Sequence, residues 1–192
     1  MKMEVGIFGG VLLDLNDPDP SLIKIKDIGW ALAQNLRFNG HTSRPYSVAM
    51  HCIHMSEVVP DHLRKAAFLH DASEAYMGDL ITPIKQHFPL YAEIEDRLIK
   101  VIFDMYGVPF EHLEAIGSWD RRCACAEAME LMGAPAWAAQ AAPLDFLPIF
   151  PAAASWYVRQ WYFARFTELF GVPVNFDNDP RYLAAPKIEN WQ

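Results

Sequence analysis

Cysteine is scarce in this chain, and the few present exclude two common classes of small protein. Cys52, Cys123 and Cys125 are an odd number, and no two of them form a Cys-x-x-Cys pair. This arrangement argues against a disulfide framework and against a structural zinc ribbon. A reducing, cytoplasmic compartment is therefore the expected location of the protein.

Long apolar runs and excess positive charge are also missing. No stretch of about 18 consecutive apolar residues occurs, so the sequence predicts neither a membrane-spanning segment nor a membrane partner. The first 15 residues do not show the charged start of a signal peptide. Sixteen basic residues stand against 24 acidic ones, which gives a net charge of −8. We therefore expect no nucleic acid polymer as a partner, and any phosphorylated substrate would need a local basic pocket.

The sequence does contain enough apolar residues to build one core. Hydrophobic residues make up 52% of the 192 positions, and this length fits a single domain over residues 1–192. Within it, residues 27–132 carry the motifs discussed below, and residues 133–192 form a C-terminal helical and extended extension.

Spacing of apolar residues and capping residues predicts an all-α fold, a compact helical bundle with irregular N- and C-terminal segments. Residues 5–15 are at most weakly β, and the last 20 residues look extended. The helices are expected from Asp27 to Asn39–Gly40, from Ser47, from Pro60 to Gly78, from Thr82–Pro83 as a short turn or helix, over Tyr91–Tyr106, from Ser118, and over Ala152–Phe170.

Two histidines and two aspartates are the candidate metal ligands: His51, His70, Asp71 and Asp120. His70 and Asp71 are neighbours, and neighbours on a helix point about 100° apart, so a cation would have to lie in the wedge between them. Imidazole and carboxylate together suit Mn²⁺, Fe²⁺, Co²⁺ or Zn²⁺ better than Ca²⁺, and Mg²⁺ stays among the candidate cofactors. Each of these residues also has a simpler interpretation as an ordinary core or surface residue.

The sequence around these residues resembles a known protein family. Tyr46–His51, and then His-Asp-Ala-Ser-Glu at 70–74, Gly-Asp-Leu at 78–80 and Thr-Pro at 82–83, look like the HD-domain phosphohydrolases. More narrowly they are similar to bacterial 5′-deoxynucleotidases and to phage-encoded relatives that act on dATP. The resemblance covers about residues 27–132, and it implies a metal-dependent HD-domain helical bundle, a homo-oligomer, and a bacterial or phage-infected cell.

The resemblance also implies roles for residues outside the metal set. Glu74 would orient or deprotonate the attacking water, and helical spacing puts it on the same side as His70 and Asp71. Asp79 would contact the sugar 3′-hydroxyl. The candidate substrate-binding residues are Arg37, Phe38, Arg44, Thr82, Pro83 and Lys85. Phe38 stands where several relatives have a tryptophan near the base, and Trp30 is a second aromatic that could stack or belong to the core.

Three functions stay open at this point. The compact length and the Arg37-Phe38-Asn39 segment favour a deoxynucleoside triphosphate (dATP) triphosphohydrolase that releases deoxynucleoside and triphosphate. The alternative is a 5′-deoxynucleotidase that converts a deoxynucleoside monophosphate to deoxynucleoside and phosphate. The third is a helical module that binds a nucleotide without turnover.

Overall fold

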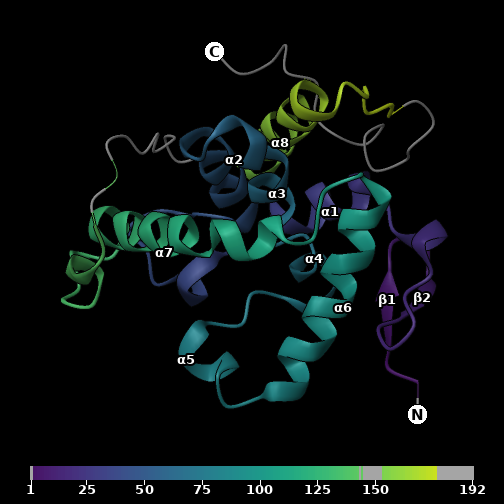
Figure 1. Ribbon diagram of the computed structural model, residues 1–192, viewed down its shortest axis with the longest axis horizontal. Coiled ribbons are helices and arrows are strands. Elements are labelled where there is room, and N and C mark those ends of the chain that lie inside the picture. The colour runs from purple at the N-terminus through teal and green to yellow at the C-terminus, as the bar shows by residue number, and fades with distance from the viewer. Residues whose placement is uncertain (1, 143, 145–152, 177–192) are drawn as a thin grey trace.

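The computed structural model describes residues 2–142, 144 and 153–176, and this part of the chain is mostly helical (Figure 1). The fold class expected from the sequence is therefore confirmed at the level of a helical body. The α-helices are α1 Ile25–Leu32, α2 Val48–Val58, α3 Arg64–Leu69, α4 Glu74–Met77, α5 Thr82–Lys85, α6 Pro89–Met105, α7 His112–Leu131 and α8 Ser155–Phe170. Short 3-10 turns are η1 Pro20–Leu22, η2 Arg37–Gly40, η3 Asp61–Leu63 and η4 Ala138–Gln140.

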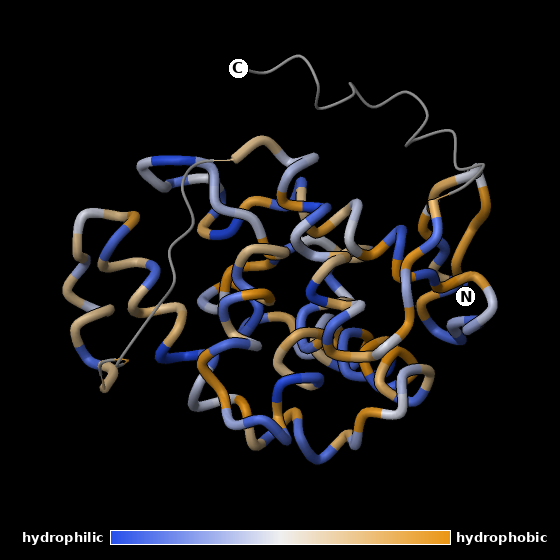
Figure 2. Tube along the Cα trace, turned by 90° about the horizontal axis from the view of Figure 1, so that it is seen from above, coloured by the Kyte–Doolittle hydropathy of each residue, from blue (hydrophilic) through white to orange (hydrophobic). Residues whose placement is uncertain are grey.

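Helix α2 lies at the centre and packs against α3, α7 and α8. Its residues are buried continuously from Val48 to Ser56, and that stretch includes the polar side chains of His51 and His54. Seen from above, hydrophilic segments alternate with hydrophobic ones through the coils of the body (Figure 2). As the sequence predicted, Ser47 caps the helix, and its hydroxyl accepts a hydrogen bond from the backbone N–H of Met50. The central helix thus carries polar groups into the core.

The prediction of one continuous helix over Pro60–Gly78 is wrong. This segment divides into η3, α3 and α4, with a stretch of tight turns at 70–73 between the last two. There the backbone bonds switch to the i→i+3 pattern, as from Ala72 N to Leu69 O at 2.9 Å and from Glu74 N to Asp71 O at 3.0 Å. Gly78 ends α4 at φ 82°, a conformation that favours glycine. The break lies at the His-Asp pair itself.

The expected start of the helix containing Asp120 is also wrong. Ser118 does not cap it, because α7 begins six residues earlier at His112 and Ser118 lies within it. Ile116 is buried in the core, so packing of this first part holds it helical. Asp120 consequently projects from the middle of a helix and not from its N-terminus.

Helix α1 is shorter than expected. It covers Ile25–Leu32, starts before Asp27 and ends well before Asn39–Gly40. The chain then becomes extended: Leu36 pairs with Ser47 in an isolated bridge, and Arg37 N donates to Tyr46 O at 3.0 Å. This pairing brings Arg37 next to the start of α2.

The remaining elements follow the sequence more closely. The weakly β N-terminus is a hairpin, with β1 (Glu4–Ile7) antiparallel to β2 (Val11–Asp14). Helix α6 and helix α8 lie within a few residues of the expected bounds, and the expected start at Ala152 lies outside the described residues. Most of the segment expected to be extended, residues 177–192, also lies outside them. No helix in the described part of the chain has the length and apolarity needed to cross a membrane.

Packing of α1 on α8 predicts a stability difference between two glycines. A Cβ at Gly29 would lie 2.5 Å from Phe163 Cε1 and 2.7 Å from Tyr162 Cδ1, whereas a Cβ at Gly117 in α7 would meet nothing within 4 Å. We expect Gly29→Ala to lower the free energy of unfolding by about 1–3 kcal/mol through overpacking. Gly117→Ala should raise it by about 0.5–1 kcal/mol, because alanine is the better helix former.

Urea unfolding followed by circular dichroism measures both changes. Equal midpoints for the two variants would contradict the close contact between α1 and α8.

Candidate metal centre

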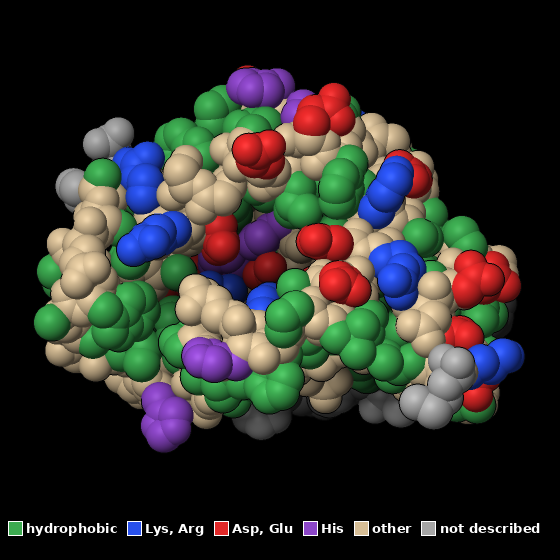
Figure 3. Space-filling view, turned by 60° about the horizontal axis from the view of Figure 1, so that its bottom comes forward, with side chains coloured by type: hydrophobic (Ala, Val, Ile, Leu, Met, Phe, Trp, Pro, Cys, Tyr) green, Lys and Arg blue, Asp and Glu red, His purple; other side chains and the backbone are tan. Residues whose placement is uncertain are grey.

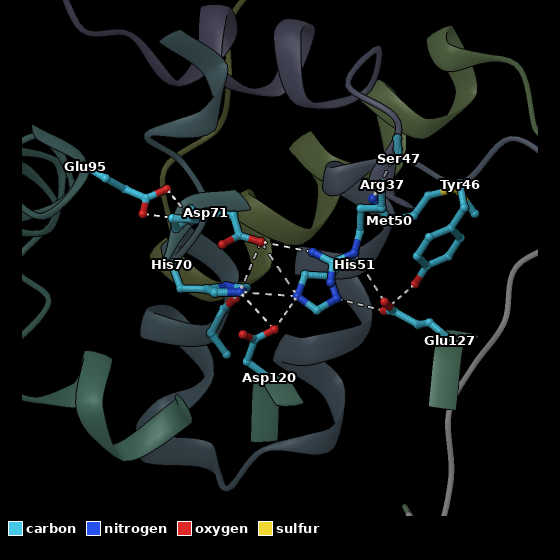
Figure 4. A network of polar contacts seen from close by, with 12 residues as sticks. Arg37, Tyr46, Ser47, Met50, His51, His70, Asp71, Glu95, Asp120 and Glu127 are labelled. Atoms are coloured by element: carbon cyan, nitrogen blue, oxygen red, sulfur yellow. Dashed lines mark hydrogen bonds and ion pairs between the residues drawn. The ribbon is translucent and has the colours of Figure 1, made fainter. Parts of the chain in front are cut away.

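Four side chains from three separate segments lie close together, as the sequence predicted (Figure 4). His51 comes from α2, His70 and Asp71 from the turn after α3, and Asp120 from α7. His51 Nε2 lies 3.1 Å from Asp120 Oδ1 and 3.2 Å from His70 Nε2, and His70 Nε2 lies 3.2 Å from Asp71 Oδ2. The two remaining nitrogen–oxygen separations, His51 to Asp71 and His70 to Asp120, are both 3.7 Å.

The two imidazoles are oriented as metal ligands usually are. His51 Nδ1 donates to a carboxylate oxygen of Glu127 at 2.7 Å, and His70 Nδ1 donates to the carbonyl of Ala67 at 2.8 Å. Since both acceptors lack a proton, each Nδ1 carries the hydrogen and each Nε2 of the neutral ring presents its lone pair to the centre. Ligand atoms of His51, His70 and Asp120 lie within 4.8 Å of one another. This donor set fits a divalent cation.

The electrostatics of the centre point the same way. Burial lowers the pKa of His70, but Asp71 and Asp120 outweigh it and raise the pKa well above its ordinary value. Burial raises the pKa of Asp120, but hydrogen bonds from His51 and His70 bring it well below its ordinary value. The carboxylates therefore stabilise positive charge at this point, and a bound cation would supply that charge in place of protons on the histidines.

Glu127 is the residue that holds His51, and it was not among the site residues predicted from the sequence. It is fully buried, accepts the phenol hydrogen of Tyr46 at 2.7 Å, and lies 3.3 Å from Arg37 Nε. Since Tyr46 donates to Glu127, the 2.7 Å contact between its hydroxyl and His54 Nδ1 must have His54 as the donor. Burial lowers the pKa of His54 to about 4, so this ring is neutral.

The signal that would have found Glu127 is its spacing. It follows Asp120 by seven residues, which is two helical turns, so both side chains lie on the same face of α7. A carboxylate behind a ligating histidine is a common way of fixing the ring.

Arg37 lies against the carboxylates of the centre, and its predicted contact with a phosphate stays a prediction. Its guanidinium pairs with Glu127 and with Asp71 Oδ2, the latter at 3.4 Å, and its side chain is only 11% exposed. It thus binds the carboxylates of the centre.

Glu74 lies beside the centre, as its spacing from the His-Asp pair predicted. Its side chain is buried, and Oε2 makes no hydrogen bond within the described residues. Burial raises the pKa of this carboxyl, and the charges of Asp71 and Asp79 raise it further. Asn35 fixes the backbone by donating to the Glu74 carbonyl at 2.9 Å. An unpaired buried oxygen with a raised pKa suits a group that exchanges a proton with a ligand.

Asp79 follows the end of α4 and is partly buried. Burial raises the pKa of its carboxyl, although the nearby positive charge of Arg37 lowers it. This coupling places Asp79 within the electrostatic reach of the centre, while its predicted contact with a sugar hydroxyl stays a prediction.

The other expected substrate residues are spread around α5 and α7. Lys85 is held by Glu95 of α6, at 2.8 and 2.9 Å from its two oxygens. Thr82 and Pro83 form the exposed first turn of α5. Arg44 Nη2 lies 3.7 Å from Glu130 Oε1 on α7, so a carboxylate faces this cation as well.

The two aromatic candidates for base stacking are engaged in packing. Phe38 packs on a small cluster formed by Cys125, Ala128 and Ala138. The Trp30 ring lies under the guanidinium of Arg159, 3.7 Å from ring centroid to carbon. Both rings therefore have structural partners in this arrangement.

A second group of possible ligands overlaps the first. Cys52, His70 and Asp71 also offer atoms within 4.8 Å of one another. Burial raises the pKa of the Cys52 thiol to about 11, so the sulfur is a neutral neighbour of the centre. His51, His70, Asp71 and Asp120 stay the predicted ligand set, of which His51, His70 and Asp120 form one such group.

The centre is open on one side. Asp120 is 41% exposed and Asp71 17% exposed, whereas His51 is fully buried. On the face shown in Figure 3 the surface is hollowed, and histidine and acidic side chains gather at the floor of the hollow with basic ones beside them. A small anionic ligand could therefore approach the carboxylate side of the centre.

Comparison with known proteins gives relatives without a described activity. No family model matches the chain. An uncharacterized protein of Escherichia coli K12, YfdR, is 41% identical over 87 residues, which is 45% of this chain and 49% of that protein. Uncharacterized protein RCAP_rcc00048 of Rhodobacter capsulatus is 39% identical over 113 residues, 54% of this chain and 58% of that protein. The chain thus spans about half the length of the curated relatives it matches.

The hydrogen bond from Glu127 to His51 predicts an effect on metal affinity. Glu127→Gln removes the charge behind the ring and leaves Arg37 without one partner, so we expect divalent metal to bind about 10–100-fold more weakly. Competition of the purified protein with a chelator for Co²⁺ or Zn²⁺ measures this directly.

Glu130→Gln is the matched control, since Glu130 lies on the same helix, is exposed, and has no described contact with the four ligands. Its metal affinity should equal that of the wild type. If Glu127→Gln behaves as Glu130→Gln does, Glu127 has no part in holding the centre.

Proposed function

We propose that this chain is a metal-dependent phosphohydrolase of the HD-domain type that acts on deoxynucleotides. The observation that carries the proposal is the convergence of His51, His70, Asp71 and Asp120, with both Nε2 atoms facing the carboxylate oxygens. The order of these residues along the chain, and the motif around them, support the same class of enzyme.

A divalent cation bound by these four residues would supply Lewis-acid chemistry, which polarises a phosphoryl oxygen and makes water more acidic. Glu74 would take the proton from the attacking water, because its buried oxygen is unpaired and adjacent to the ligands. Arg37 would hold Asp71 and Glu127 in place, since it pairs with both. Asp79 and Lys85 would then face the sugar and the phosphate.

The charge balance favours a monophosphate as substrate. Each candidate cation already faces a carboxylate: Arg37 faces Asp71 and Glu127, Lys85 faces Glu95, and Arg44 faces Glu130. A triphosphate brings more negative charge than a monophosphate and needs more free cationic donors. Hydrolysis of a deoxynucleoside monophosphate to deoxynucleoside and phosphate is therefore the first candidate.

The dATP triphosphohydrolase expected from the sequence stays the second candidate. One observation supports it: Lys85 is partly exposed and interacts with the charges of Glu74 and Asp71, so it would be available to phosphate if it left Glu95. Binding without turnover is the third, and the buried, unpaired carboxylate of Glu74 argues against it. The homo-oligomer implied by the resemblance stays a prediction.

Replacing Glu74 separates catalysis from metal binding. We expect Glu74→Gln to lower kcat about 10²–10⁴-fold, the usual contribution of a general acid or base, while metal affinity changes little. His70→Asn should lose both turnover and metal binding, because it removes a predicted metal ligand. Steady-state turnover and a metal titration on the same preparations provide the comparison, and a Glu74→Gln protein with full turnover would refute the assigned role.

Product identification distinguishes the two substrates. Incubation of the wild-type protein with each dNMP and dNTP, in Mn²⁺, Co²⁺ or Mg²⁺, should release orthophosphate from a monophosphate. Tripolyphosphate from a dNTP would establish the second candidate instead. If no deoxynucleotide is hydrolysed with any of these metals, the proposed function is wrong.

A further inference from the structure

An ion pair between α5 and α6 lies beside the candidate centre. Lys85 Nζ is 2.8 Å and 2.9 Å from the two oxygens of Glu95, and the side chains are 27% and 18% exposed. In Figure 4 the Glu95 carboxylate lies on the same side of the site as Asp71. The sequence marked Lys85 as a phosphate ligand, but it gave no indication of Glu95.

The surroundings of this pair are acidic. Burial lowers the pKa of Lys85, but the hydrogen bond and charge of Glu95 outweigh it, and the charges of Glu74 and Asp71 add to the upward shift. Burial also raises the pKa of Glu95, and the charge of Asp71 opposes its ionisation. Glu95 thus adds negative charge to a region that already carries Glu74, Asp71 and Asp79.

We propose that Glu95 is a specificity-determining residue: by occupying Lys85, it limits how many phosphate groups the site accepts on its substrate. This inference rests on the proposed phosphohydrolase function and deepens it. Glu95 would favour a monophosphate, and its removal would shift the preference toward a triphosphate.

The physical reason is competition for one ammonium group. Lysine has three N–H donors, and Glu95 binds Nζ through both oxygens at short distance. A phosphate that approaches Lys85 must share or displace that carboxylate. The repulsion from Glu95 grows with the negative charge near it, so the penalty is larger for a polyphosphate tail than for one phosphate.

Glu95→Gln keeps the size of the side chain and removes its charge. We expect the ratio of kcat/KM for dATP to kcat/KM for dAMP to rise about tenfold. The substitution removes the repulsion between one partly buried charge and the additional phosphate groups of dATP, and a repulsion of this kind changes affinity by about that factor. The change should appear in KM, with kcat altered less than about threefold. Conditions of metal and salt are identical for all variants, so chelation of metal by dATP cancels in the comparison.

Glu93→Gln is the matched control. It lies two residues away on α6, is exposed, and loses the same charge. Its ratio should equal that of the wild type. In the Lys85→Met background Glu95→Gln should no longer change the ratio by tenfold, because the two residues act as a pair. Glu95→Asp serves as a second variant if Glu95→Gln does not fold. Its kcat/KM ratio should lie between that of the wild type and the tenfold higher value expected for Glu95→Gln.

Three results would overturn the inference: a ratio for Glu95→Gln equal to that for Glu93→Gln, an undiminished effect in the Lys85→Met background, or weaker binding of both nucleotides in Glu95→Gln. The last result would make Glu95 a residue that positions Lys85 for phosphate.

A readout without turnover keeps this test separate from the proposed function. Orthophosphate binding to the Mg²⁺-loaded protein, followed by ³¹P NMR, should tighten about threefold in Glu95→Gln and stay unchanged in Glu93→Gln. Absence of hydrolysis in the wild type would refute the proposed function, whereas unchanged orthophosphate binding in Glu95→Gln would refute the role of Glu95.

Discussion

The hydrogen bond between His51 and Glu127 is the interaction on which the centre depends. His51 lies on the most buried helix of the molecule, where an imidazole without partners would be costly. Glu127 accepts a hydrogen bond from Nδ1 of the ring, and Nε2 faces Asp120 and His70. Tyr46 in turn donates a hydrogen bond to the buried carboxylate of Glu127, and Arg37 forms an ion pair with it. The polar groups around His51 are therefore connected to one another, with the candidate metal site at the open end.

Charge balance around that network shapes what the site can bind. The four candidate ligands concentrate negative charge, and the cations that the sequence offers for phosphate are largely paired with carboxylates. Arg37 is the clearest case, because it is nearly buried between Glu127 and Asp71. Lys85 differs from it, since its partner Glu95 lies at the edge of the site and both are partly exposed. Selectivity among phosphorylated ligands is thus expected to depend on Lys85 more than on Arg37.

Local sequence signals predicted the helices where capping and periodicity were strong. Ser47 capped α2 as expected, and the apolar spacing of α6 was correct to within a few residues. The failures have physical causes. Ser118 looks like a cap, but packing of Ile116 extends α7 past it. The stretch 60–78 has helical spacing throughout, yet tight i→i+3 turns interrupt it at the His-Asp pair.

By itself the sequence identified the histidines and aspartates that lie together at the centre and the mostly helical class, because residue type and short-range spacing are local properties. It could not determine which carboxylate each cation meets. Residues 37 and 127, or 85 and 95, come together only when separate elements pack, and no local pattern encodes that choice. The tertiary structure therefore decided that Arg37 supports the centre, that Glu127 orients His51, and that Glu95 holds Lys85.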